Sequence, residues 1–279
     1  MTIPSPSYLR PDTVLHIYYL QGRLPRQYQF PTPDFIGNWE EDGFSFLFFR
    51  APADQEIALL LSRHADLSLL DQFEMTYESW QGGAITPLRV GRFLLNPPWI
   101  RASAAPGDIS LTLDAGVVFG NGTHPTTLDC LTAMEIALAG HKVDTMLDLG
   151  CGTGILALAA AKLGCGRILA VDFNGLAART TLNNVRLNNL SGQILPIQGK
   201  AEDYTAIATD LLVANIHYEV MAKIVRSDGF LRQKWFILSG LLRSEAAKIA
   251  DFLASQPVVI LKRWDQEVWH TFLGITLPQ

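Results

Sequence analysis

The chain has little cysteine, little charge and no long apolar run. Its 279 residues include only three cysteines, at positions 130, 151 and 165, and none has the C-x-x-C or Cys/His spacing of a zinc site. This sparse, odd number argues against a disulfide framework and suits a reducing compartment. Charged residues make up 18% of the chain, below the usual share of about a quarter. We therefore expect no metal site and no disulfide scaffold.

Targeting features are also missing from the sequence. The start, Met1-Thr2-Ile3-Pro4-Ser5-Pro6, lacks the basic and apolar regions of a signal peptide. No apolar run reaches the length needed to cross a bilayer. The net charge of −5 and the pI near 5.7 argue against a surface that follows nucleic-acid phosphates. We expect a soluble cytoplasmic protein without a membrane partner, and nucleic acid is disfavoured as a substrate.

The first eighty residues predict a small α+β domain. Strands are expected at 13–20, 43–50 and 73–80, and a helix at 54–63, from the β-branched and aromatic runs and from the helical apolar spacing. The turn residues Glu41-Asp42-Gly43 leave the alternative that 43–50 is the return half of a hairpin. Residues 81–116 follow, with four prolines and short strands near 88–95 and 109–113. Proline stiffens such segments, so we expect a semi-rigid linker at 81–116 between domains at 1–80 and 117–279.

From residue 117 onward, short buried runs alternate with helical spacing. Strands are expected at 145–149, 167–171, 193–198, 211–216 and 235–238, and helices at 125–139, 155–163 and 176–188. This alternation is typical of a mostly parallel sheet covered on both faces. The last two runs, 258–263 and 268–276, have no helix between them and predict a closing antiparallel hairpin. The sequence therefore predicts an α/β fold with a seven-stranded sheet.

The most distinctive stretch is the predicted strand-to-helix turn Asp148-Leu149-Gly150-Cys151-Gly152-Thr153-Gly154. Glycines at alternate positions leave the backbone bare, so a flat ligand could lie directly against it. The spacing is tighter than the dinucleotide pattern G-x-G-x-x-G, and no basic residue follows to meet a phosphate. A nucleoside without phosphates fits better, and this points to S-adenosylmethionine.

Two carboxylates accompany these glycines. Asp172 ends the next predicted strand, where it could accept hydrogen bonds from both ribose hydroxyls, and Asp148 precedes the glycines. A single aspartate at a strand end is ordinary turn chemistry, but the combination at this distance is specific. We predict that the donor is bound by Asp148, Gly150, Gly152, Gly154 and Asp172.

An asparagine follows the fourth predicted strand, in Asn215-Ile216-His217-Tyr218. In open α/β sheets, ligands bind beyond the carboxyl ends of strands, near the point where strand order reverses. Asn215 could hold the methionine end of the donor or orient a substrate amine there. The alternative is a cap on the next helix. Enzymes that methylate nucleic-acid bases often carry Asn/Asp-Pro-Pro-aromatic at this position, and both prolines are absent here.

A further motif lies upstream, at Phe119-Gly120-Asn121-Gly122-Thr123-His124-Pro125-Thr126-Thr127. It predicts a glycine-hinged loop that ends in a helix start, with proline at the first helical position. Its hydroxyls could simply cap that helix. The density of glycine, hydroxyl and imidazole groups is nevertheless greater than a cap requires.

Together these stretches resemble the ribosomal protein L11 methyltransferase family. The family pattern reads close to F-G-T-G-T-H-P-T-T, and Asn121 stands here for one threonine. The segments 87–92, 97–99 and 239–242 are similar to family segments as well. The resemblance is specific over about residues 85–245 and fades over the first eighty, where family members carry their substrate-recognition domain.

The resemblance implies a Rossmann-like class I methyltransferase that modifies lysine side chains and an N-terminal amine of ribosomal protein L11. By matching position, it implies donor contacts from four residues, Thr127, Gly150, Asp172 and Asn215. Phe119 and His124 would line the entrance where donor and acceptor meet. The candidate catalytic residues are therefore His124, Asn215 and Phe119.

Methyl transfer from a sulfonium needs alignment of the reacting atoms but no metal. Desolvation and the nearby positive charge both lower the pKa of an acceptor lysine, so a dedicated base is not required. His124 is a candidate proton shuttle, and a positioning role is the alternative. Two other functions stay open: the same chemistry on another protein lysine or a nucleic-acid base, and a cofactor-binding module that no longer catalyses.

Overall fold

The computed structural model describes residues 8–25 and 27–278, and they form two compact units. Unit 1 comprises the described residues of Met1–Thr86 together with Gly116–Val118. Unit 2 comprises the described residues of Pro87–Ala115 and Phe119–Gln279. The chain therefore leaves unit 2 for only three residues, between Ala115 and Phe119. Within the described ranges, no helix is both long and apolar enough to cross a bilayer.

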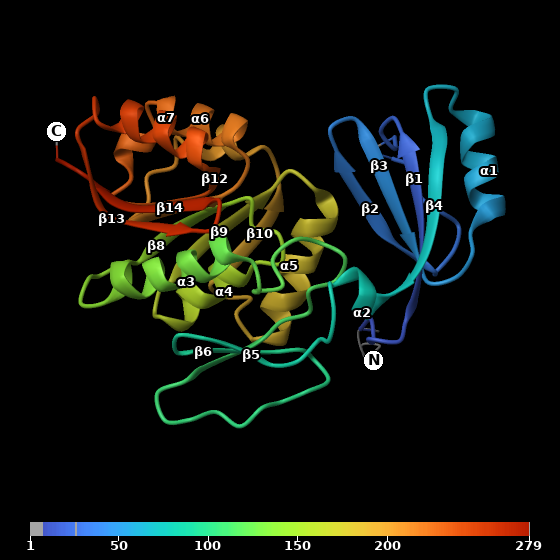
Figure 1. The fold of residues 1–279 in the computed structure, drawn as a ribbon, viewed down its shortest axis with the longest axis horizontal. Helices are drawn as coiled ribbons and strands as arrows, with labels where there is room; N and C mark the ends of the chain where they lie inside the picture. Colours follow the sequence, from blue (N-terminus) through green and yellow to red (C-terminus); the bar gives the residue numbers. More distant parts are fainter. Residues whose placement is uncertain (1–7, 26, 279) are drawn as a thin grey trace. The chain divides into compact units, whose positions relative to one another are not determined.

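Unit 1 is a four-stranded antiparallel sheet with a helix on one face (Figure 1). Its strands are β1 (Val14–Gln21), β2 (Phe35–Glu41), β3 (Phe44–Phe49) and β4 (Ser68–Thr76), in the order β2-β3-β1-β4. Helix α1 (Asp54–Arg63) buries Ile57 and Leu60 in a cluster with Leu20, Leu47 and Phe49. The small α+β architecture predicted for this part is therefore present.

Two elements of unit 1 differ from the prediction. Strand β2 had no predicted range of its own, because Gly37, Asn38 and two glutamates dilute its aromatic content. It pairs with β3 across the turn at residues 41–44, and this confirms the hairpin alternative for 43–50. The expected strand 73–80 ends early: β4 stops at Thr76, whose side chain accepts a hydrogen bond from the amide of Ser79. That N-cap starts the short helix α2 (Tyr77–Trp80) instead.

The segment 81–116, expected as a linker, is divided between the two units at residue 87. Residues 87–115 carry β5 (Leu88–Val90), β6 (Phe93–Asn96) and β7 (Ile109–Thr112), which pair in the order β5-β6-β7. Phe93, Leu95 and Leu111 are almost fully buried in the core of unit 2. This stretch is packed into unit 2 because the apolar side chains of β6 and β7 contribute to that core.

The main element of unit 2 is a seven-stranded sheet (Figure 1). Its strands are β8 (Thr145–Leu149), β9 (Arg167–Asp172), β10 (Ile194–Gln198), β11 (Leu211–Asn215), β12 (Trp235–Leu242), β13 (Val258–Gln266) and β14 (Trp269–Thr276). The spatial order is β10-β9-β8-β11-β12-β14-β13. The first five run parallel, and β14 is antiparallel to both β12 and β13. The predicted fold class is confirmed, including the closing hairpin.

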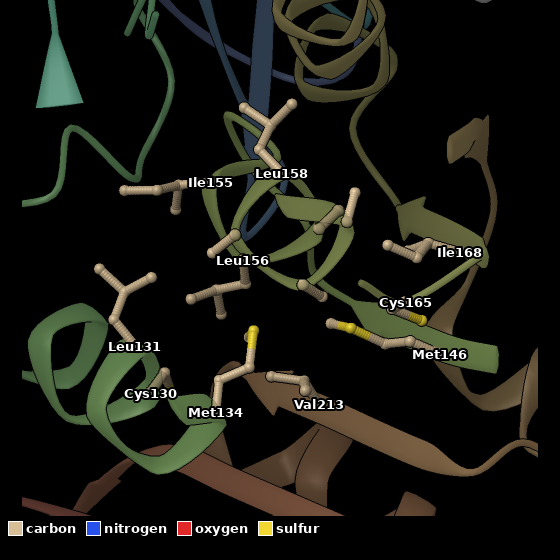
Figure 2. Close-up of a cluster of buried hydrophobic side chains, with 14 of the residues drawn as sticks. Cys130, Leu131, Met134, Met146, Ile155, Leu156, Leu158, Cys165, Ile168 and Val213 are labelled. Carbon is tan, nitrogen blue, oxygen red and sulfur yellow. The ribbon is translucent and has the colours of Figure 1, made fainter. Parts of the chain in front are cut away.

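Helices cover both faces of this sheet. They are α3 (Pro125–Leu138), α4 (Ile155–Lys162), α5 (Gly175–Leu187), α6 (Tyr218–Arg226) and α7 (Arg243–Leu253). On one face, side chains of α3 and α4 pack with Met146 and Val213 (Figure 2). On the other, α6 and α7 pack with the alternate strand positions Leu147 and Leu212. Both faces are buried, as expected for parallel strands.

The strand order reverses between β8 and β11. From β8 the chain proceeds outward through β9 to β10, and it then returns to place β11 on the other side of β8. A crevice for ligands forms at such a switch point, beyond the carboxyl ends of the two strands. The segments that leave these ends are the glycine turn, which we define as residues 150–154, and Asn215 with the residues after it.

Candidate functional site

The glycine turn has a left-handed backbone at each of its glycines. The φ angles are +77° at Gly150, +54° at Gly152 and +80° at Gly154. A Cβ at Gly150 would lie 2.1 Å from Cγ2 of Ile216, and one at Gly152 would lie 2.5 Å from the carbonyl oxygen of Phe119. Glycine is therefore required because other segments of the protein crowd the turn, in addition to any space that a ligand needs.

Asp172, the last residue of β9, holds the glycine turn. Its Oδ2 accepts a hydrogen bond from the amide of Gly152 (2.9 Å), and its Oδ1 accepts one from the amide of Asn174 (2.8 Å). Burial raises the pKa of the Asp172 carboxyl, and these two amides oppose the rise. Each carboxylate oxygen has a further lone pair, so Asp172 can accept two more hydrogen bonds from a ligand at this edge.

Asp148 lies in a different environment from Asp172. It is fully buried, and its Oδ2 accepts from the amide of Ala157 (3.1 Å) in the first turn of α4. Its Oδ1 has no hydrogen-bond partner among the described residues. Burial raises the pKa of this carboxyl to about 7. The contact supports the helix that follows the turn, and the contact of Asp148 with the donor stays a prediction.

A hydrogen-bond chain connects Asn215 with the upstream motif. Nδ2 of Asn215 donates to Oγ1 of Thr126 (3.1 Å), and that hydroxyl lies 2.8 Å from Nδ1 of His124. The backbone amide of Thr126 also points at Nδ1 (3.3 Å). Because an amide can only donate, Nδ1 is the acceptor, the Thr126 hydroxyl donates to it, and Nε2 carries the ring proton. His124 thereby caps the N-terminus of α3.

His124 also lies between two aromatic rings. Its ring centroid is 5.3 Å from that of Phe119 and 5.0 Å from that of Trp269, both with edge-on geometry. Burial lowers the pKa of His124, and the charge of Glu267 partly opposes this shift. Phe119 is 49% exposed, so it presents apolar surface at the rim. Trp269 was not predicted, because it lies far along the chain and carries no local motif.

The remaining predicted residues lie close to the hydrogen-bond chain formed by Asn215, Thr126 and His124. Thr127 is almost fully buried in the first turn of α3, and its amide donates to the carbonyl of His124 (3.0 Å). Gly240 lies next to Asn215; its φ is +85°, and a Cβ there would lie 3.1 Å from Oδ1 of Asn215. Asn121, which departs from the family pattern, accepts from the amide and the hydroxyl of Thr123 (3.0 and 2.7 Å) and so stabilises the loop.

The structure therefore brings all three predicted motifs to one edge of the sheet. The amide of Thr153, in the glycine turn, donates to the carbonyl of Phe119 (3.1 Å), while Gly150 packs against Ile216, which follows Asn215. Thr126 and Thr153 make key contacts that were not predicted individually, although both lie inside the motifs. Among the described residues, no group of three or more His, Cys, Asp or Glu side chains could hold a metal ion.

Comparison with known proteins places these features in a family. The sequence profile of the family described as "Ribosomal protein L11 methyltransferase (PrmA)" matches residues 54–276. This chain belongs to that family. The match includes part of the first eighty residues and the C-terminal hairpin, and so it extends beyond the region over which the sequence resemblance was specific.

Individual relatives agree with the family profile. The ribosomal protein L11 methyltransferase of Pelotomaculum thermopropionicum is 31% identical over 223 residues, which cover 77% of this chain and 72% of that protein. That of Lacticaseibacillus paracasei is 37% identical, and the match spans 66% of this chain but only 58% of the relative. The crystal structure of a ribosomal protein L11 methylase from Lactobacillus delbrueckii subsp. bulgaricus aligns with a TM-score of 0.61 and 25% identity, over 69% of this chain and 99% of that chain.

Membership makes the chain a methyltransferase whose methyl donor is S-adenosylmethionine. The residues present fit this donor. Asp172 offers free lone pairs to ribose hydroxyls at the switch point of the sheet. The bare backbone of the glycine turn lies next to it, and the carboxamide of Asn215 lies at the neighbouring strand end.

Proposed function

We propose that this chain transfers methyl groups from S-adenosylmethionine to lysine side chains, and to an N-terminal amine, of ribosomal protein L11. One observation carries the proposal. The glycine turn, Asp172 and the hydrogen-bond chain Asn215–Thr126–His124 lie together at the carboxyl ends of the parallel strands. Its relatives are named for this activity. We further propose that it acts in the cytoplasm, on a protein rather than on nucleic acid.

Within this site, each residue has a definable role. When bound, S-adenosylmethionine supplies an electrophilic methyl group on a sulfonium, which leaves as a neutral thioether when the amine nitrogen attacks. Asp172 would accept hydrogen bonds from the ribose hydroxyls. Asn215 is fixed by Thr126 and orients the reacting groups, because near-attack alignment supplies much of the rate gain in such a displacement. Phe119 and Trp269 exclude water beside His124, and exclusion of water favours the neutral form of an acceptor lysine.

The tautomer of His124 supports a positioning role rather than that of a base. Because Nδ1 accepts from Thr126 and Nε2 carries a proton, the neutral ring has no free lone pair for an acceptor ammonium. His124→Asn keeps a good N-cap, and we expect it to lower kcat by less than about tenfold, whereas loss of a general base costs about 10²–10⁴-fold. Steady-state kinetics at saturating donor measures this. A loss of kcat in the larger range would contradict the assignment.

The pH dependence of His124 has a definite sign. Its pKa is lowered from the ordinary 6.5, so below that pH the unfolded chain binds a proton that the folded chain resists. The stabilisation by neutral His124 is complete above 6.5 and is lost as the pH falls toward the lowered value. As the pH falls below 6.5, the melting temperature should fall more steeply in the wild type than in His124→Asn. Parallel melting curves would contradict this.

We propose that unit 1 recognises the acceptor protein through the sheet face opposite α1. Ile17 and Phe48 on that face are buried, so we define the open face as its partly exposed register row that contains Tyr19. Residues 1–86 hold 11 of the 27 acidic residues but only 5 of the 22 basic ones, and no lysine. The face opposite α1 carries Trp39, Phe46, Tyr19 and Asp71 in one register row, and the Tyr19 and Phe46 rings stack at 4.5 Å. Aromatic faces and carboxylates together attract lysine and arginine side chains, and the proposed acceptor presents lysines to the enzyme.

A charge reversal on this face tests the role. Asp71 and Glu74 are both exposed on β4 but lie on opposite faces of the sheet. We expect Asp71→Lys to raise the KM for ribosomal protein L11 by about fivefold with kcat unchanged, and Glu74→Lys to have less than half that effect. Initial rates at several acceptor concentrations measure both. Equal effects of the two variants would show that the open face is not the docking surface.

The acceptor itself is tested by transfer of labelled methyl groups. Purified enzyme would be given hypomethylated ribosomal protein L11 alongside a whole-cell extract, with the products mapped by mass spectrometry. We expect label on lysines of L11. Label on another protein and none on L11 would overturn the proposed acceptor while leaving the transfer chemistry intact.

A further inference from the structure

Asparagine side chains in α5 and at its C-cap hold the backbone at residues 112–114. Nδ2 of Asn184 donates to the carbonyl of Asp114 (2.8 Å), and its Oδ1 accepts from the amide of the same residue (2.8 Å). Asn188 makes the same pair of bonds with Thr112, at 2.7 and 2.9 Å. These two carboxamides thus pair with the end of β7 much as a neighbouring strand would.

Asn184 differs from Asn188 in one contact. Its Nδ2 also donates to the carbonyl of Thr153 (2.9 Å), inside the glycine turn. Asn188 instead donates its second bond to the carbonyl of Asn184 (2.8 Å). Asn184 is fully buried, so each of its bonds is protected from water, and breaking one leaves an unsatisfied polar group in the interior.

The glycine turn is therefore tied to the chain on both sides of residues 115–118. Before them, Asn184 joins Asp114 to Thr153. After them, the amide of Thr153 donates to the carbonyl of Phe119 (3.1 Å), and its hydroxyl donates to the carbonyl of Gly120 (2.7 Å). Between these anchors, residues 116–118 belong to unit 1.

We propose that Asn184 is a positioning residue that couples donor binding at the glycine turn to the order of residues 112–114. The inference rests on the proposed function in that the glycine turn holds the donor. A shift of Thr153 must either move Asp114 with it or break a buried hydrogen bond. Coupling between sites is reciprocal, so donor binding orders residues 112–114, and order in this segment favours donor binding.

The asparagine pair provides a matched test. Asn184→Ala and Asn188→Ala each remove two bonds to the 112–114 backbone, but only the first removes the bond to the glycine turn. Calorimetry with S-adenosylhomocysteine should show about tenfold weaker binding for Asn184→Ala and no more than about a twofold change for Asn188→Ala. The KM for S-adenosylmethionine should rise in the first variant, with kcat at saturating donor retained. Equal losses in the two variants would overturn the proposal.

Amide hydrogen exchange tests the coupling in the wild-type protein, without a variant that might fold poorly. Saturating S-adenosylhomocysteine should slow exchange of the Asp114 amide by about tenfold. The Thr145 amide, held by Asp210 at the opposite end of the strands (2.9 Å), serves as the control and should change much less. An unchanged Asp114 amide in a protein that binds the ligand would overturn the coupling. Failure of the wild type to bind the ligand at all would instead overturn the proposed function.

Discussion

Asp172→Ala is expected to weaken S-adenosylhomocysteine binding by at least about 100-fold, equivalent to roughly 3 kcal/mol. The carboxylate is placed to accept two ribose hydroxyls, and it also accepts the amides of Gly152 and Asn174. Its removal therefore takes away ligand contacts and leaves the glycine turn without its support. Isothermal titration calorimetry with the purified protein measures the loss.

Asp172→Asn provides the control for charge. The carboxamide keeps one oxygen for an amide but places an NH2 group where the other amide donates, so binding should be weaker than in the wild type and stronger than in Asp172→Ala. Urea unfolding separates this effect from global stability. Unchanged affinity in Asp172→Ala would show that the ribose is held elsewhere.

Gly152→Ala is expected to reduce donor affinity by about 50-fold, since two costs combine. An L side chain at φ +54° costs about 1 kcal/mol or more. In addition, the new Cβ would lie 2.5 Å from the carbonyl oxygen of Phe119, so the turn and the Phe119 loop cannot both keep their positions. Calorimetry and a thermal melt would be recorded on the same preparation.

Gly140→Ala is the matched control. Gly140 also has a left-handed backbone, with φ +75°, but none of the described atoms lies within 4 Å of the position of its Cβ. This variant should lose about 1 kcal/mol of stability and keep the donor affinity of the wild type. If Gly152→Ala bound the ligand as tightly as Gly140→Ala, close packing of the two motifs would not matter for the donor site.

The sequence predicts well what depends on neighbouring residues. The glycine turn and Asp172 are recognisable because strand, turn and helix signals follow one another within some 25 residues. Asn215 is recognisable because it ends an apolar run, and parallel strands bring their carboxyl ends to one edge. The alternation of strands and helices predicted the α/β sheet for the same reason.

The sequence does not reveal which side chains contact one another when they lie far apart along the chain. The helix at 176–188 was predicted, but nothing in its periodicity indicates that Asn184 and Asn188 bond to residues 112–114. Trp269 reaches His124 only because β14 lies beside β12 in the folded sheet. Prolines in 81–116 suggested a linker, although the burial of Phe93 and Leu111 makes that stretch part of the core.

The role of Asp148 illustrates the same limit. Its position before the glycines made it a candidate donor contact, while the fold turns its carboxyl toward the amide of Ala157 under the turn. Local sequence places such a residue near the site. Only the packing of α4 decides which way its side chain points.

The central claim is that the donor binds at the carboxyl ends of β8, β9 and β11. A crystal structure of the protein with S-adenosylhomocysteine tests this claim most directly. We predict that the ribose hydroxyls lie within hydrogen-bond distance of Asp172, that the adenosine lies along the glycine turn, and that the amino-acid end approaches Asn215. A ligand bound at another edge of the sheet, or one that leaves Asp172 without contact, would contradict the account.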